Sequence, residues 1–215
     1  MAFTTAASPS VQGFSANRAL QITLAVCAVV WVWAAIDPVY RFDWFLENIL
    51  VAVGVGLFAW LHRTRPLSDL SHLLLAVFFC MHVAASHYTY SETPWGDWLK
   101  DALDTDRNHY DRIVHFSFGL LLAYPVREYL VRHVRFSGFS SFFFAFVVLV
   151  ACSEVYEIIE WLVAAIVDPE AGTAFLGTQG DPFDAQKDTA LALLGTVLTL
   201  CATALFERRC HVNNR

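Results

Sequence analysis

Long apolar runs separated by short polar stretches dominate the pattern of residues along the chain. About 20 apolar residues are needed to cross roughly 30 Å of hydrocarbon as a helix, and each run is close to that length. The joints between runs hold prolines, glycines or charged residues that interrupt helices, and the two longest joints follow the third and fifth runs. The pattern therefore predicts six membrane-spanning helices, near residues 19–36, 44–61, 68–87, 108–131, 138–167 and 183–206.

The composition supports a membrane protein. Hydrophobic residues make up 57% of the 215 residues, and the mean hydropathy is +0.48. Charged residues make up only 16%, compared with about 25% in ordinary soluble domains. The first run is longer than the apolar part of a secretory signal, so we expect an uncleaved helix. The predicted fold class is all-α: a polytopic membrane protein that forms one six-helix bundle in the lipid bilayer.

The distribution of basic residues predicts the orientation, because cytoplasmic loops carry the excess of Lys and Arg. With the N-terminus inside, the inner segments hold Arg18, Arg63, Arg65, Arg127, Arg132, Arg135, Arg208, Arg209 and Arg215. The outer segments hold Arg41, Lys100, Arg107, Arg112 and Lys187. We therefore expect cytoplasmic tails at 1–18 and 207–215 around a transmembrane domain at 19–206. The sequence has neither a basic face nor a nucleic-acid recognition module, so we do not expect nucleic-acid binding.

Two predicted helices begin with the same spacing of polar residues. The fourth has Asn108 as its cap, Asp111 in its first turn and His115 one turn deeper. The sixth repeats these three offsets with Asp181, Asp184 and Asp188. Because both helices enter from the predicted outer face, His115 and Asp188 should lie at similar depth, roughly 10 Å below the caps.

The fifth predicted helix approaches that depth from the other side. Glu154, Glu157 and Glu160 recur at steps of three and form a slanting row on one side of the helix. His82 and His87 lie near the outer end of the third helix. A charged group facing lipid at mid-membrane costs about 2.5–3.5 kcal/mol, so these side chains should converge on a polar pocket in the outer half of the bundle.

Structural roles compete with functional ones for several of these residues. Asp111 and Asp184 fit first-turn acids near a cap, and His82 fits a packed core histidine equally well. Arg112 and Lys187 fit structural ion pairs with two of the carboxylates. Function is favoured for the residues that lie away from helix ends and need partners, namely Glu154, Glu157, His115 and Asp188.

Histidine together with aspartate and glutamate oxygens is a plausible ligand set for Zn²⁺ or another divalent cation. A metal-activated water there would attack a phosphoester, ester or amide of a lipid or cell-envelope substrate. The candidate metal ligands are His87, His115, Glu157 and Asp188, and the candidate catalytic groups are Glu154, Glu157 and Asp188. The candidate substrate-binding residues are Tyr88, Tyr90, Tyr110, Arg112, Tyr156 and Lys187. The chain has no HExxH, GxSxG or C-x-x-C motif, so this chemistry follows from convergence alone.

Four long segments carry a family resemblance: "HYTYSETP", "RNHYDRIVHFSFGLLLAYPVREY", "SEVYEIIEW" and "AFLGTQGDPFDAQKDTALALLG". In this order they resemble the YjdF-like family of bacterial inner-membrane proteins, over about residues 20–206. The resemblance implies a multi-pass protein of the inner membrane and assigns no catalytic residue. The last segment is also similar to VanZ-like membrane proteins, where Asp184, Asp188 and Gly195 match and Ala192 replaces an expected Asn.

Two other functional classes stay open. A proton- or cation-coupled transporter would use intramembrane Glu and His residues as a relay. The lack of a sequence repeat and the placement of the polar residues in one half of the bilayer argue against it. A non-catalytic scaffold would use the same polar cluster only to hold its helices together.

Overall fold

The computed structural model describes residues 17–167, 172 and 175–213, and this part of the chain is helical without a strand. Its elements are α1 (Arg18–Ala35), α2 (Arg41–Thr64), α3 (Asp69–Tyr88), η2 (Tyr90–Glu92), α4 (Pro94–Leu103), α5 (Tyr110–Tyr129), η3 (Leu130–Val134), α6 (Gly138–Ile166) and α8 (Asp184–Asn213). Residues 1–16 of the predicted N-terminal tail and the final residues 214–215 lie outside the described part. The all-α prediction is confirmed.

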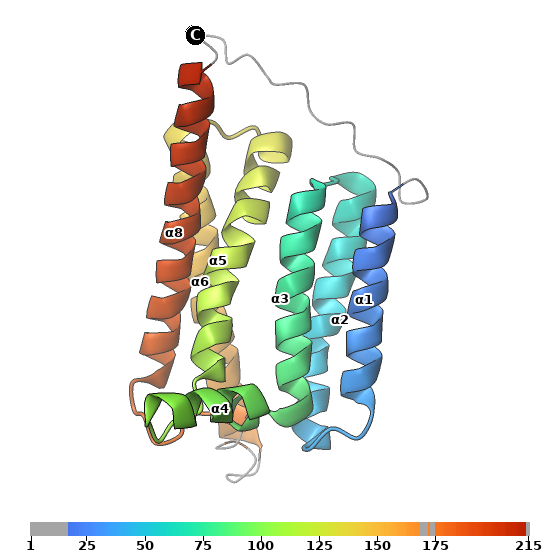
Figure 1. Ribbon diagram of the computed structural model, residues 1–215, viewed down its shortest axis with the longest axis vertical. Helices are drawn as coiled ribbons and strands as arrows, with labels where there is room; N and C mark the ends of the chain where they lie inside the picture. Colours follow the sequence, from blue (N-terminus) through green and yellow to red (C-terminus); the bar gives the residue numbers. More distant parts are fainter. Residues whose placement is uncertain (1–16, 168–171, 173–174, 214–215) are drawn as a thin grey trace.

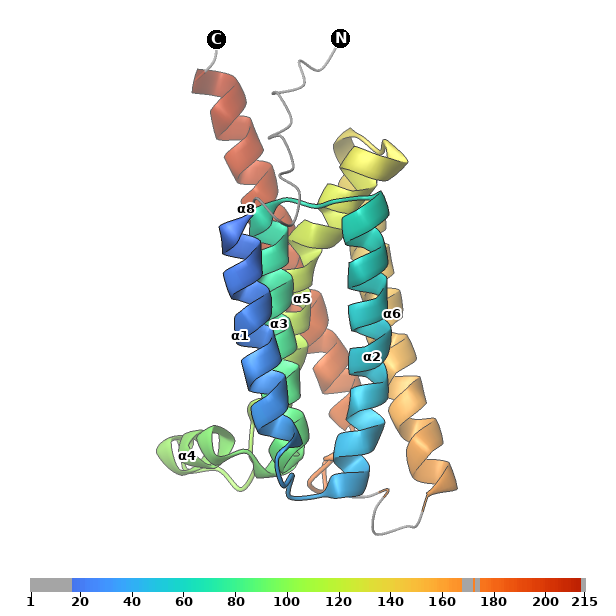
Figure 2. The ribbon, with the colours of Figure 1, turned by 90° about the vertical axis from the view of Figure 1, so that its right-hand side faces the viewer.

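The six long helices run up and down beside one another, and the short α4 lies across one end of the bundle (Figure 1). The start of α1 and the end of α8 lie at the same end, opposite α4 (Figure 2). All six predicted helices are present, with shifted ends. The fourth begins at Tyr110, two residues later than predicted, and the last continues to Asn213.

Five of these helices, α1, α2, α3, α6 and α8, are long and apolar enough to cross a membrane. The sixth long helix, α5, has Asp111, Arg112 and Arg127 within its length and is less apolar. It contacts α3, α6 and α8, so much of its surface meets protein. A helix in this central position tolerates polar residues because they face other helices.

The helix α4 corrects the prediction of one long loop between the third and fourth apolar runs. Pro94 stands at its start, where a missing N–H breaks no helical hydrogen bond. Its apolar residues recur at helical spacing, at Trp95, Trp98, Leu99, Ala102 and Leu103. At ten residues the helix is too short to span a bilayer.

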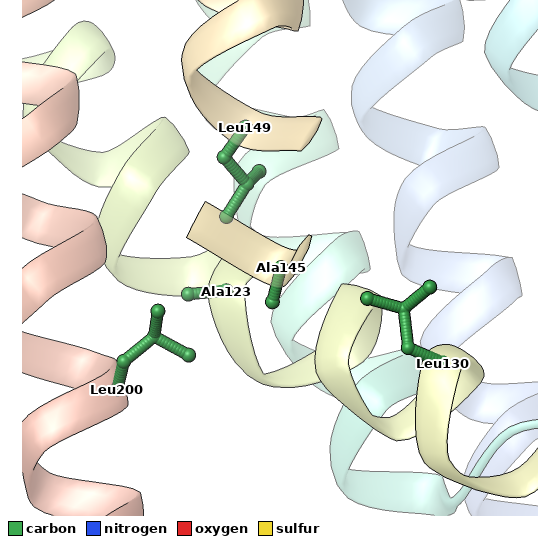
Figure 3. Close-up of a cluster of buried hydrophobic side chains, with 5 residues drawn as sticks. All are labelled: Ala123, Leu130, Ala145, Leu149 and Leu200. Carbon is green, nitrogen blue, oxygen red and sulfur yellow. The ribbon is translucent and has the colours of Figure 1, made fainter. Parts of the chain in front are cut away.

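An apolar cluster fills the half of the bundle away from α4. Side chains from α5, η3, α6 and α8 meet there (Figure 3), and its buried members are Ala123, Leu130, Ala145, Leu149 and Leu200. Two of the five are alanines, which let the helices approach closely. Apolar packing therefore joins α5, α6 and α8 in this half, beside the ion pair between Arg127 of α5 and Glu207 of α8.

The backbones of α5 and α8 touch at two glycines. A Cβ atom on Gly119 would lie 1.9 Å from the carbonyl oxygen of Ala192, and one on Gly195 would lie 2.2 Å from that of Phe116. Small residues permit such contacts between membrane helices, where packing replaces the hydrophobic effect as the driving force. These contacts fix α5 and α8 at one separation and one register.

We expect Gly119→Ala to destabilise the protein by about 1–3 kcal/mol, the usual penalty for overpacking a tight contact. Gly54→Ala is the matched control, because a Cβ atom there meets nothing within 4 Å. The measurement is thermal unfolding of both variants in the same detergent. Equal melting temperatures for Gly119→Ala and wild type would show that α5 and α8 are not in backbone contact.

Candidate functional site

The glycine contact brings three polar side chains together. His115 lies one turn before Gly119 in α5, and Asp188 lies one turn before Ala192 in α8. Asp111, His115 and Asp188 each offer a metal-ligating atom, and these atoms lie within 4.8 Å of one another. All three residues are buried, and Asp188 is only 2% exposed. The predicted convergence of His115 and Asp188 at one depth is thus present in the structure.

A carboxylate from α6 completes this group. Glu157 Oε1 lies 3.5 Å from His115 Nε2, and Asp111 Oδ1 lies 3.5 Å from the same nitrogen. The Tyr156 ring packs near the His115 ring, with centroids 5.9 Å apart. His115 therefore lies between two carboxylates contributed by different helices.

A cavity of about 220 Å³ adjoins this group. Its lining residues are Asp111, Glu157, Glu160, Trp161, Leu176, Thr178, Asp184, Ala185 and Asp188. Because one water molecule occupies about 30 Å³ in the liquid, the cavity has room for an ion and several waters. Among the described residues of its lining, carboxylates are the only ionisable groups, which suits a cation.

Two oxygens of this group lack hydrogen-bond partners. Among the described residues, neither Asp188 Oδ1 nor Glu157 Oε1 receives a hydrogen bond, and both atoms are buried. Leaving a buried polar atom unpaired costs about 1–3 kcal/mol, and more when the group is charged. A bound cation would remove this penalty at both atoms.

Basic residues hold the carboxylates at the edge of the cavity. Arg107 Nη2 lies 2.6 Å from Asp184 Oδ1, and both side chains are nearly buried. Arg107 also donates through Nη1 to the Thr178 carbonyl at 2.6 Å. The guanidinium therefore joins the segment before α5 to the segment before α8.

Arg112 and Lys187 both bind Asp181, at 2.6 and 2.5 Å. The hydrogen bond from the Lys187 ammonium, helped by the Phe183 N–H and Arg112, lowers the pKa of the Asp181 carboxyl to about 2. The structural ion pairs considered for Arg112 and Lys187 are thus present. These two predicted substrate-binding residues are both engaged by the protein's own carboxylate.

Asn108 connects α4 to the cavity wall. Its side chain accepts from the Tyr110 N–H at 3.1 Å and donates to the Thr93 carbonyl at 2.9 Å and to Asp97 Oδ1 at 3.0 Å. Its backbone exchanges hydrogen bonds of 2.8 and 3.0 Å with the Gln179 side chain. Asn108 is 1% exposed, so this connection is part of the interior.

The structure does not bring His87 to the metal-ligating group. Its Nδ1 lies 3.2 Å from the Ala34 carbonyl oxygen, and its ring stacks on Trp33 with centroids 4.8 Å apart. The adjacent Tyr88 ring meets Trp95 edge-on, 5.5 Å away. These predicted ligand and substrate residues lie beside α1 and α4 and do not line the cavity.

The predicted row of glutamates on α6 divides. Glu157 and Glu160 line the cavity, whereas Glu154 is exposed and does not. Each step of three residues rotates the position by about 60°, so three such positions spread over about 120° of the helix. The three positions therefore cover a wider arc of the helix than the arc that faces the cavity.

A buried carboxylate on α2 was not among the residues predicted from the sequence. Glu47 is 6% exposed, and its Oε2 lies 3.8 Å from His82 Nε2. His82 Nδ1 lies 2.5 Å from the Tyr90 hydroxyl, and the Tyr156 hydroxyl interacts with both Glu47 and Glu160. The available signal was a pair of acids one turn apart, Asp43 and Glu47, in an otherwise apolar run.

The other predicted substrate-binding tyrosines are also held inside the protein. Tyr90 binds His82, and the Tyr110 hydroxyl donates to the Met81 carbonyl at 3.0 Å. Neither residue lines the cavity. Of the predicted set, Glu157 and Asp188 line the cavity, and His115 and Tyr156 lie beside them.

An all-helical bundle with five apolar helices and a buried acidic cavity defines a polytopic membrane protein. The chain belongs to the family described as "Predicted membrane protein (DUF2238)", which matches residues 19–209. It is 34% identical, over 195 residues and 90% of each chain, to "Inner membrane protein YjdF" of Escherichia coli (strain K12). No solved structure matches the chain. The family expected from the four motifs is confirmed, and the VanZ-like similarity stays a prediction.

We expect Arg107→Met to destabilise the protein by about 3 kcal/mol, since breaking a buried ion pair leaves the other charge uncompensated. This is the low end of the usual range, because Arg112 lies 3.5 Å from Asp184 and compensates in part. Lys187→Met is the control: its side chain is 50% exposed, and an exposed pair is worth about 0–1 kcal/mol. Denaturant titration in mixed micelles gives both values, and a penalty for Lys187→Met as large as that for Arg107→Met would refute the assignment.

Proposed function

We propose that the chain spans the bacterial inner membrane six times, with both termini in the cytoplasm and the cavity toward the outer face. The excess of basic residues at the end opposite α4 supports this orientation. The relative in Escherichia coli is named an inner-membrane protein, which supports the location. We count α5 as the sixth span, because its 20 residues extend about 30 Å.

We further propose that Asp111, His115 and Asp188, together with Glu157, bind a divalent cation such as Zn²⁺. The observation that carries this proposal is Asp188 Oδ1, which is buried beside His115 and Asp111 without a hydrogen-bond donor among the described residues. One histidine nitrogen with carboxylate oxygens suits Zn²⁺ and other first-row divalent ions. Glu154 and His87 have no part in the proposed site.

The reaction class we propose is hydrolysis or group transfer on a lipid or cell-envelope substrate. A bound divalent ion would act there as a Lewis acid and generate a hydroxide nucleophile near neutral pH. Glu160 lines the same cavity and contacts Tyr156, so it can accept a proton from a reacting group. Trp161 and Leu176 supply apolar surface at the cavity for the non-reacting part of a substrate.

Proton- or cation-coupled transport is the second candidate. It is favoured by the buried chain from His82 and Glu47 through Tyr156 to Glu160 at the cavity. A relay of this kind is typical of intramembrane acids and histidines in transporters. Ion flux in liposomes separates transport from hydrolysis, and the scaffold class predicts neither flux nor bound metal.

The topology is expected to be inside–inside. A reporter fused after Arg215 should be active in the cytoplasm, and a tag inserted between Thr105 and Asp106, both exposed, should be accessible from outside. Paired reporters that are active only in the cytoplasm or only in the periplasm make this measurement. An external C-terminus with an internal tag at 105/106 would show that the bundle is inverted, and an external C-terminus with an external tag would show that the number of spans after residue 106 is even.

Metal binding should depend on Glu157 and Asp188 and not on Glu154. We expect Glu157→Gln and Asp188→Asn to remain folded but to lose bound metal, because each removes a ligand and also relieves repulsion among neighbouring carboxylates. Glu154→Gln, on the same helix but exposed, is the matched control and should keep the metal.

The measurement is elemental analysis of purified protein beside thermal unfolding in detergent. A wild-type protein that never holds metal, together with a strongly destabilised Asp188→Asn, would favour the scaffold class. The reason is that a purely structural carboxylate stabilises the fold through the partners it keeps.

A further inference from the structure

A largely exposed apolar stripe lies along α4. Its members are Trp95, Trp98, Leu99, Ala102 and Leu103. Trp98 is 70% exposed and Leu103 is 57% exposed, while Gly96 is the one residue of α4 that is buried. The charged residues Asp97, Lys100 and Asp101 lie on the opposite side of the helix.

The placement of α4 identifies what covers the stripe. The helix lies across the end of the bundle and projects sideways from it, whereas the long helices run along the bundle axis (Figures 1 and 2). A helix in this position lies in the plane where apolar spans give way to water. Amphipathic helices with Trp and Leu on the apolar side occupy that plane in membranes.

A second observation supports a lipid contact. Aromatic rings from three elements gather at the same end: Trp33 of α1 lies 6.1 Å from Tyr88 of α3, which lies 5.5 Å from Trp95 of α4. Trp33 and Trp95 are 40% and 38% exposed. Tryptophan and tyrosine are enriched at the level of the lipid headgroups. The stripe thus continues a surface that already has the character of a membrane interface.

We propose that the apolar stripe of α4 inserts among the phospholipid headgroups of one leaflet and anchors this end of the bundle to the membrane surface. Asn108 joins α4 to Gln179 beside the cavity wall, so the anchor also fixes the depth of the cavity edge. The anchor itself does not depend on a bound metal.

Spin labels on opposite sides of α4 test the anchor. Leu103→Cys and Asp101→Cys are labelled in a background where Cys27, Cys80, Cys152, Cys201 and Cys210 are replaced by Ala. The two positions are about 200° apart around the helix. In phospholipid nanodiscs, the label at 103 should be more accessible to oxygen than to a water-soluble nickel complex, and the label at 101 should show the reverse.

Two results would overturn the proposal. Higher nickel accessibility at both positions would place the stripe in water, and low accessibility of 103 to both reagents would place it against protein, such as a second copy of the chain. If the cysteine-free background does not fold, brominated phospholipids provide a second measurement in the wild-type background. They should quench the emission that Trp98 contributes, which is the difference between wild type and Trp98→Phe, and a difference emission that is not quenched would also refute the anchor.

Discussion

The backbone contact between α5 and α8 is the constraint on which the rest of the structure depends. Gly119 and Gly195 allow it, and the side chains one turn away are then held at a fixed distance. Sliding one helix past the other by a turn, about 5.4 Å, would separate His115 from Asp188. The acidic cavity is therefore a consequence of close packing between small residues, and α6 completes it with Glu157.

Charge is distributed unevenly between the edge and the interior of the cavity. At the edge, Asp181 and Asp184 are held by nearby basic side chains. Deeper in the bundle, Asp188 and Glu157 each retain a buried oxygen without a donor among the described residues. The basic residues thus compensate the negative charge at the edge of the cavity. The electrostatic potential in its interior stays negative, which favours a cation over an anionic group.

The long helices and the depth of the polar groups were predictable because both follow from counting residues at a known rise. The sequence could not show that Glu154 points away from the cavity, since that depends on which part of α6 faces its neighbours. Nor could it pair Glu47 with His82, because that contact joins two helices whose packing no local pattern specifies. His87 was included in the predicted set because it stands near the end of its helix, and its contact with α1 depends on helix packing that the sequence does not show. The helix α4 was missed because its apolar stripe spans only ten residues.

The parallel arrangement of α5 and α8 has an electrostatic consequence. Both helices begin at the acidic end, so both N-termini, each equivalent to roughly half a positive charge, point toward the carboxylates. This field stabilises the carboxylates of Asp111 and Asp184, which lie in first turns. Because the field decays within one turn, it stabilises the carboxylate of Asp188 much less. The two helix dipoles therefore support the acidic edge of the cavity, whereas the deeper Asp188 depends on its side-chain neighbours His115 and Asp111.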